Sequence, residues 1–154
     1  MSIEPNVLAE IDAFLAAWPD VTLATADVHG RPQAATVGIA VTPERGLIFD
    51  TLESTRKYPN LIANPKVALV IGWDATGRTI QYEGEAELLT PGTLEFEHLQ
   101  GIYLERFPSG RERLTWPGLC YFHVRPTWIR YSDFRTPPPR IFELTGPDLE
   151  ADLA

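Results

Sequence analysis

The stretch of sequence that decides the fold is Leu47–Trp73, which reads LIFDTLESTRKYPNLIANPKVALVIGW. Apolar residues at its two ends predict strands, and the proline and asparagine residues between them bound a short helix. A turn rich in hydroxyl groups joins the first strand to that helix, and it ends in the chain's only Arg-Lys dipeptide. The stretch therefore predicts a strand over 46–50, a cationic turn, a helix over 59–64 and a strand over 66–73.

The turn predicts a phosphate-binding site. Arg56 presents a planar fork of donors and Lys57 a point charge, which are two common ways in which proteins hold phosphate. Hydroxyl donors precede them at Thr51, Ser54 and Thr55. For an isolated turn of this kind, two solvated cations on the surface are the commoner outcome. The small residues of a neighbouring strand lead us to favour a binding site at this turn.

That strand spans 33–41, and its residues alternate between the two faces of a sheet. One face is apolar and is expected in the core: Ala35, Val37, Ile39 and Val41. Every residue of the other face is small: Ala34, Thr36, Gly38 and Ala40. A face of small residues lets a flat group approach the backbone. Packing against a helix or a second subunit is an equally weighted alternative.

The other segments complete an antiparallel sheet with peripheral helices. A helix is expected within 1–18, capped by Asn6, and the turn His29-Gly30 joins two strands within 21–41. The remaining expected elements are a strand over 78–89, a helix over 90–107 with Leu94, His98 and Ile102 on one side, and a last strand over 119–134 with Pro126 at a bulge or edge. Six strands with short connections favour a sheet that closes into a barrel.

Thr79 and Gln81 begin the strand over 78–89 with neutral hydrogen-bonding side chains. Either they line a site or they face water. The glutamates that follow on the same face are expected to form a solvated surface: Glu83, Glu85 and Glu87.

Length, charge and composition limit the classes of protein to which this chain can belong. The 154 residues fit one domain over 1–154, which ends in a tail over 135–154 that is rich in proline and acidic residues and is expected to be mobile at its end. A formal net charge of -8 weighs against nucleic acid as a partner. One cysteine and three scattered histidines do not suggest a metal site. The start has neither the basic residues nor the apolar run of a secretory signal, and no run is long enough to span a membrane, so we expect a cytoplasmic protein.

Three segments together resemble the pyridoxamine 5'-phosphate oxidase-like family of FMN-binding split barrels. They are DVHGRPQAATVGI, LIFDTLESTRKYPNLIANPKVALVIGW and RTIQYEGEAELL. The resemblance runs from about Val21 to Leu89 and resumes weakly in the last strand. It implies a mainly β, six-stranded antiparallel split barrel of Greek-key type. It also implies a homodimer with two FMN sites at the subunit interface.

The resemblance further implies which residues contact the cofactor. Arg56 and Lys57 match the positions that hold the FMN phosphate, beside Asp50, Thr51, Ser54 and Thr55. The backbone of Thr36, Val37 and Gly38 is expected along the isoalloxazine ring. Thr79 matches a glutamine that touches the flavin, and Gln81 lies one step further along the same face. Trp116, in TWPG, is similar to a tryptophan that the partner subunit contributes.

The sequence departs from the true oxidases where they carry an Arg and a substrate-binding Lys, because Ala35 and Ala40 stand there. We therefore expect a flavin-dependent oxidoreductase for a small molecule that is not a pyridoxamine phosphate oxidase, and no side chain is assigned as the catalytic acid or base. Three alternatives stay open: a deazaflavin-dependent reductase of the same fold, a non-catalytic flavin-, haem- or stress-related protein, and a barrel that has lost its ligand.

Overall fold

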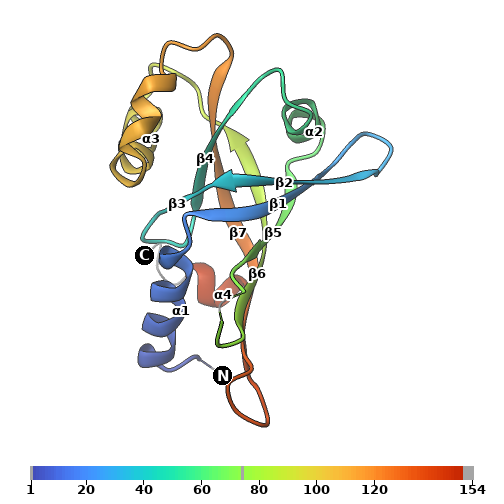
Figure 1. Cartoon of the computed structure of the whole chain (residues 1–154), viewed down its shortest axis with the longest axis vertical. Helices are drawn as coiled ribbons and strands as arrows, with labels where there is room; N and C mark the ends of the chain where they lie inside the picture. The colour runs from blue at the N-terminus through green and yellow to red at the C-terminus, as the bar shows by residue number, and fades with distance from the viewer. Residues whose placement is uncertain (1, 74, 151–154) are drawn as a thin grey trace.

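The computed structural model describes residues 2–73 and 75–150, and its centre is an antiparallel sheet (Figure 1). In chain order the elements are α1 (Pro5–Ala17), β1 (Asp20–Ala26), β2 (Pro32–Gly38), β3 (Ala40–Val41), β4 (Leu47–Leu52), α2 (Lys57–Ala63), β5 (Lys66–Ile71), β6 (Arg78–Leu88), α3 (Leu94–Arg106), the 3-10 helix η1 (Pro108–Arg113), β7 (Leu119–Asp133), β8 (Arg140–Leu144) and α4 (Gly146–Glu150).

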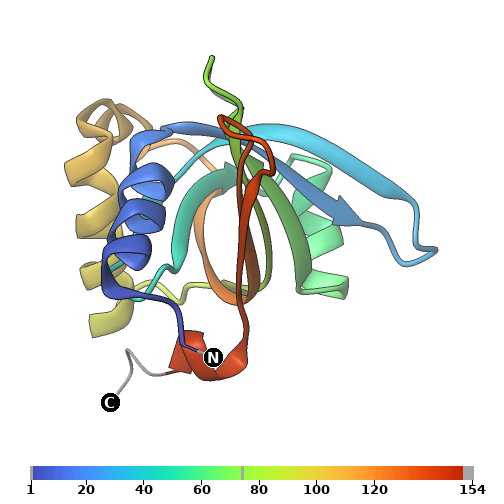
Figure 2. The ribbon, with the colours of Figure 1, turned by 90° about the horizontal axis from the view of Figure 1, so that it is seen from below.

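The order of the strands closes the sheet into a split barrel, as predicted. Neighbouring strands follow the order β2-β1-β5-β6-β7-β4-β3. Because β2 and β3 are consecutive pieces of one strand, interrupted at Ile39, the two ends of this order belong to the same stretch of chain. The strand β5 returns to lie beside β1 after β4, which is the Greek-key arrangement. Figure 2 shows the curled sheet, with α1 and α3 on one side and α2 on the other.

The tail contains more regular structure than the sequence predicted. The strand β8 pairs with the end of β7, from Ile129 opposite Leu144 to Asp133 opposite Arg140, and α4 follows. This strand is short and comes directly after a run of prolines, so its alternation spans too few residues to be recognised. The expected mobile end falls largely on residues 151–154, which lie outside the described residues.

Pro126 lies at a bulge, as predicted. In the pairing of β6 with β7, Glu83 lies opposite Trp128 and Gly84 opposite Pro126, so Thr127 is the extra residue. A bulge tolerates proline because the ladder of hydrogen bonds is already interrupted there.

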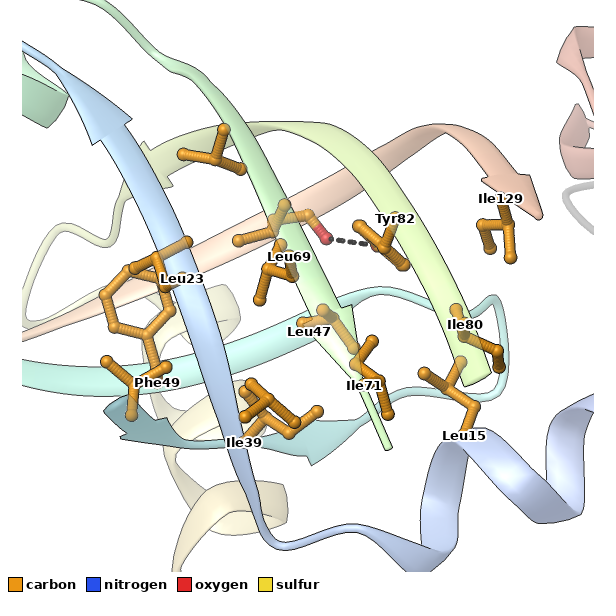
Figure 3. Close-up of a cluster of buried hydrophobic side chains, with 14 of the residues drawn as sticks. Leu15, Leu23, Ile39, Leu47, Phe49, Leu69, Ile71, Ile80, Tyr82 and Ile129 are labelled. Atoms are coloured by element: carbon orange, nitrogen blue, oxygen red, sulfur yellow. Dashed lines mark hydrogen bonds between the residues drawn. The ribbon is translucent and has the colours of Figure 1, made fainter. Parts of the chain in front are cut away.

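The main core fills the barrel. Figure 3 shows side chains from several strands and from α1 meeting in its interior, including Leu15, Leu23, Leu69 and Ile80. Each fully buried aliphatic side chain contributes about 1.5–3 kcal/mol to folding. The helix α1 covers one end of this core with Ile11 and Leu15, and it begins after Glu4 rather than after the predicted cap Asn6.

A second, smaller core lies on the outer surface of the barrel under α3. The buried face of α3 consists of Leu99, Tyr103 and Leu104, which pack with Ile48 and Tyr121. The sequence predicted that Leu94, His98 and Ile102 share one side of this helix. That side is not the buried face, since Leu94 is 86% exposed. Within the described ranges, no helix is long and apolar enough to cross a membrane.

A cluster of charged groups joins α1 to the end of the sheet. Arg140 donates hydrogen bonds to Glu10 at 3.3 Å and to Asp133 at 3.1 Å. The hydroxyl of Tyr131 donates to Glu10 at 2.8 Å, and Arg135 donates to Asp133 at 2.8 Å. The guanidinium of Arg135 holds the pKa of Asp133 far below its usual range, and that of Arg140 lowers the pKa of Glu10.

Candidate functional site

The hydroxyl groups of the cationic turn hold the turn together. Thr51 ends the buried part of β4, and its Oγ1 lies 3.0 Å from Oγ1 of Thr55. The same Thr55 hydroxyl donates to the carbonyl of Leu52 at 2.9 Å, while Ser54 is exposed. Two of the three predicted hydroxyl donors thus already form hydrogen bonds within the turn, and they fix the direction in which the chain enters α2.

The two cations of the turn have no carboxylate partner among residues 2–73 and 75–150. Arg56 is exposed and Lys57 is the first residue of α2, which starts two residues before the predicted position. Neither side chain forms an ion pair or hydrogen bond with another described residue. Six other arginines of the described chain pair with carboxylates, whereas Arg106, Arg111 and Arg125 do not; the six are Arg31, Arg45, Arg113, Arg130, Arg135 and Arg140. Two adjacent unpaired cations are therefore a distinctive feature of this turn.

A groove of about 290 Å³ adjoins Arg56. Its other walls come from the β1–β2 hairpin, which supplies Arg31 and Gln33, and from α2, which supplies Asn60. The amide of Asn60 donates to Thr25 at 3.0 Å and to Gln33 at 3.2 Å, which fixes the relative position of the hairpin and the helix. These residues were missed in the sequence, because only the folded chain brings the hairpin beside α2.

The predicted small-residue strand has two different surroundings. Val37 points into the core, whereas Thr36 is exposed. At Gly38, a Cβ would lie 3.1 Å from Cζ of Phe107, so the ring of Phe107 occupies the space that glycine leaves. Ala40 is likewise covered by the core under α3. At Gly38 and Ala40 the small side chains therefore serve packing against other parts of the chain. The open part of this face begins at Thr36.

One row of the sheet connects Thr36 with Gln81. The pairing places Thr36 opposite Thr22, Thr22 opposite Val70, and Val70 opposite Gln81. Directly paired residues share a face, so the four side chains form one exposed row about 14 Å long. The next row consists of Ala34, Ala24, Ala68 and Glu83. The outer face of β2, β1, β5 and β6 is therefore built largely from small side chains.

The other predicted site residues are distributed around the sheet. The Thr79 hydroxyl donates to the carbonyl of Ile71 at 3.3 Å. The carboxylate of Asp50 accepts hydrogen bonds from the Tyr103 hydroxyl at 2.8 Å and from Nε of Arg113 at 2.9 Å. Burial, followed by the charge of Asp50, raises the pKa of Tyr103. Trp116 follows η1 and is 51% exposed.

No group of three or more metal-ligating side chains occurs within the part of the chain that the structure describes. Cys120 donates to the carbonyl of Thr51 at 3.4 Å, and burial raises the pKa of its thiol to about 11. His29 and His98 are exposed, and neither of them lines the groove at Arg56. The groove at Arg56 therefore offers cations and amides, together with the carboxylate of Asp27, which is paired with Arg31.

Comparison with known proteins assigns the family. The model of the family described as pyridoxamine 5'-phosphate oxidase matches residues 7–133. The chain therefore belongs to the pyridoxamine 5'-phosphate oxidase family. A pyridoxine/pyridoxamine 5'-phosphate oxidase from Granulibacter bethesdensis is 44% identical over 71 residues, which are 43% of this chain and 33% of the relative. The chain thus matches about a third of the length of this curated relative.

Two solved structures illustrate the similarity of the fold. A heme-binding protein from Mycobacterium smegmatis superposes with a TM-score of 0.80 at 18% identity, over 97% of this chain and 62% of that one. A pyridoxamine 5'-phosphate oxidase-related, FMN-binding protein from Nostoc punctiforme superposes with a TM-score of 0.71 at 18% identity, over 93% and 92% of the two chains. The same barrel is therefore found in proteins with different cofactors.

Proposed function

We propose that this chain binds FMN, with the phosphate held by Arg56 and Lys57 and the ring lying against the outer face of the sheet near Thr36. The observation that carries the proposal is the pair of cations without carboxylate partners, next to a groove that contains Gln33 and Asn60. Arginine and lysine give a phosphate strong, charge-assisted hydrogen bonds, and the exposed Ser54 adds a neutral hydroxyl donor to the same turn. The FMN-binding relative of the same fold supports the choice of cofactor.

The active form in this proposal is a homodimer. The outer face of β2, β1, β5 and β6 exposes rows of small and neutral residues, including Thr22, Ala24, Ala68 and Val70. An exposed face of this kind, with rows of small and neutral side chains, suits contact with a second copy. Trp116, which is exposed in the single chain, is proposed to complete the cofactor site of the partner.

The activity that we propose is a flavin-dependent oxidation or reduction of a small molecule. Bound FMN supplies hydride transfer, and the protein supplies position and polarity. Pyridoxamine 5'-phosphate is not the proposed substrate. Ala40 stands where the true oxidases are expected to carry a lysine, and it is buried under α3 with 2% of its surface exposed.

The test is an absorbance spectrum of the purified protein, with mass spectrometry of whatever denaturation releases. A flavin spectrum with the mass of FMN is the expected result. A deazaflavin or haem would mean that the fold is right and the proposed cofactor is wrong. Haem is a specific alternative because the Mycobacterium smegmatis protein of the same fold binds heme. A colourless protein that also fails to bind added FMN would overturn the proposal.

A further inference from the structure

A second cavity, of about 430 Å³, lies where the β3–β4 turn, the bulge of β7 and α4 meet. It shares no lining residue with the groove at Arg56. Pro126 and Leu149 contribute apolar surface, and the titratable groups of its lining are Glu44, His123 and Arg125. A mainly apolar cavity of this size with a few polar groups is typical of a small-molecule site.

His123 is the polar group best placed to recognise a ligand in this cavity. Its imidazole has no hydrogen-bond partner among the described residues. Burial lowers its pKa, against the opposing effect of nearby carboxylates, so the ring is neutral at pH 7. A neutral imidazole has one nitrogen that accepts a hydrogen bond and one that donates.

The turn that forms one wall of the cavity is held firmly. A Cβ on Gly46 would lie 2.5 Å from Nε2 of His123, so glycine is needed for the backbone to approach the imidazole. The preceding residue, Arg45, has a φ of 64°, in the left-handed region. Its guanidinium pairs with Asp12 at 2.6 Å, and its carbonyl accepts a hydrogen bond from Tyr82 at 2.8 Å. Strained backbone that is fixed from two sides is a common feature of binding sites.

The charges around His123 favour a cation. Glu44 lines the cavity, Glu87 lies opposite His123 in the pairing of β6 with β7, and Glu95 lies in the first turn of α3. All three act on the imidazole together with one guanidinium, that of Arg125. Glu44 and Arg125 line the cavity itself, and Glu87 and Glu95 add two carboxylates near the imidazole, so the surroundings of His123 favour a cation over a carboxylate.

We propose that this cavity binds a small apolar molecule that carries a protonated amine. The apolar part contacts Pro126 and Leu149, and the ammonium group donates a hydrogen bond to the neutral imidazole of His123 and is stabilised by Glu44. This site is independent of the cofactor site proposed above.

The test compares three molecules of similar size: 2-phenylethylamine, 2-phenylethanol and phenylacetate. Each is titrated into the full chain while the ring signals of the histidines are followed by NMR, with exposed His29 and His98 as internal controls. The expected result is a shift confined to His123 and an affinity for the amine about fivefold above that for the alcohol, the effect of one partly exposed ion pair. Phenylacetate should bind most weakly. Equal affinities, or no shift at His123, would overturn the proposal.

Two variants separate the contributions of charge and hydrogen bonding. In Glu44→Gln, the affinity for the amine should fall to that for the alcohol, while the alcohol is unaffected. In His123→Leu, the amine and the alcohol should both bind more weakly, because each donates a hydrogen bond to the imidazole, whereas the control His98→Leu on α3 should leave both affinities unchanged. Glu44 is exposed, so Glu44→Gln tests the proposal even if His123→Leu does not fold. A full preference for the amine in Glu44→Gln contradicts the proposal, whatever the cofactor content of the protein.

Discussion

Nε of Arg113 lies 2.9 Å from the Asp50 carboxylate, and this pair ties the segment that leads to Trp116 to the strand that leads to the cationic turn. The Tyr103 hydroxyl completes the network, since it donates to Asp50 and accepts from Nη2 of Arg113 at 3.1 Å. A backbone hydrogen bond of 2.9 Å from Glu53 to Gly118 adds a second connection. These contacts therefore fix the position of the segment before Trp116 relative to β4.

The first prediction concerns this network. Asp50→Asn keeps the shape of the side chain but leaves Arg113 without its charge partner. Because Asp50 is 14% and Arg113 29% exposed, the expected loss is about 1–2 kcal/mol in the free energy of unfolding, measured by urea denaturation. Asp27→Asn, in the exposed pair of Asp27 with Arg31, is the control and should lose less. Equal losses in both variants would show that burial adds nothing to the pair.

The second prediction concerns the cofactor. Arg56→Ala combined with Lys57→Ala should weaken binding of added FMN at least about 100-fold, because two charge-assisted contacts are lost. Fluorescence titration measures the affinity, and the unfolding transition should stay cooperative, since Arg56 lies on the surface of the turn. Arg125→Ala, which removes an exposed cation of β7, should bind FMN normally. Wild-type affinity in the double variant would disprove the phosphate assignment.

The third prediction uses the contact between Gly38 and Phe107. Gly38→Val should cost about 1–3 kcal/mol of stability, because the new side chain overlaps the ring. Adding Phe107→Leu should restore part of the loss, as measured by thermal unfolding of the single and double variants. FMN affinity should stay near the wild-type value in both variants, because the valine side chain meets the ring of Phe107 and the face open to the flavin begins at Thr36. A large loss of FMN affinity in the double variant would mean that the flavin reaches Gly38.

The fourth prediction concerns pH. The folded-state pKa of His123 is depressed by burial, so the unfolded chain binds the proton more readily. The neutral ring therefore supports folding above the ordinary pKa of histidine, near 6.5, and this contribution is lost as the pH falls through the folded pKa. Stability measured between pH 8 and pH 5 should decline less in His123→Gln than in the wild type. His98→Gln should follow the wild-type profile; if it flattens the profile equally, His123 is not the cause.

The fifth prediction concerns the thiol. With the pKa of Cys120 raised to about 11 by burial and the nearby carboxylates of Glu53 and Asp50, little thiolate exists at pH 8. Alkylation by iodoacetamide should be roughly a hundredfold slower in the folded protein than in urea, because the thiolate is the reactive form. Mass spectrometry over time gives both rates, and similar rates would indicate an accessible, reactive thiol.

The sequence predicted the barrel because most strands carry their own signals. Alternation in 33–41 and the apolar run in 66–71 depend only on neighbouring residues. The surroundings of the candidate site depend on residues that are far apart in the sequence. Tyr103 and Arg113, for example, lie 53 and 63 residues from Asp50. The row from Thr36 to Gln81 likewise requires the register of four strands. A sequence pattern could not decide whether Gly38 faced a ligand or a ring of its own chain.

The cluster that joins α1 to β8 has a consequence for the order of folding during synthesis. Glu10 and Arg140 are separated by 130 residues, so the ribosome completes α1 and most of the barrel before Arg140 is added. Until then the Glu10 carboxylate lacks this guanidinium. The helix is already held by its apolar contacts with the core and by the ion pair of Asp12 with Arg45. The pairing of Glu10 with Arg140 is therefore among the last of these contacts to form on the nascent chain, and it connects α1 to β8.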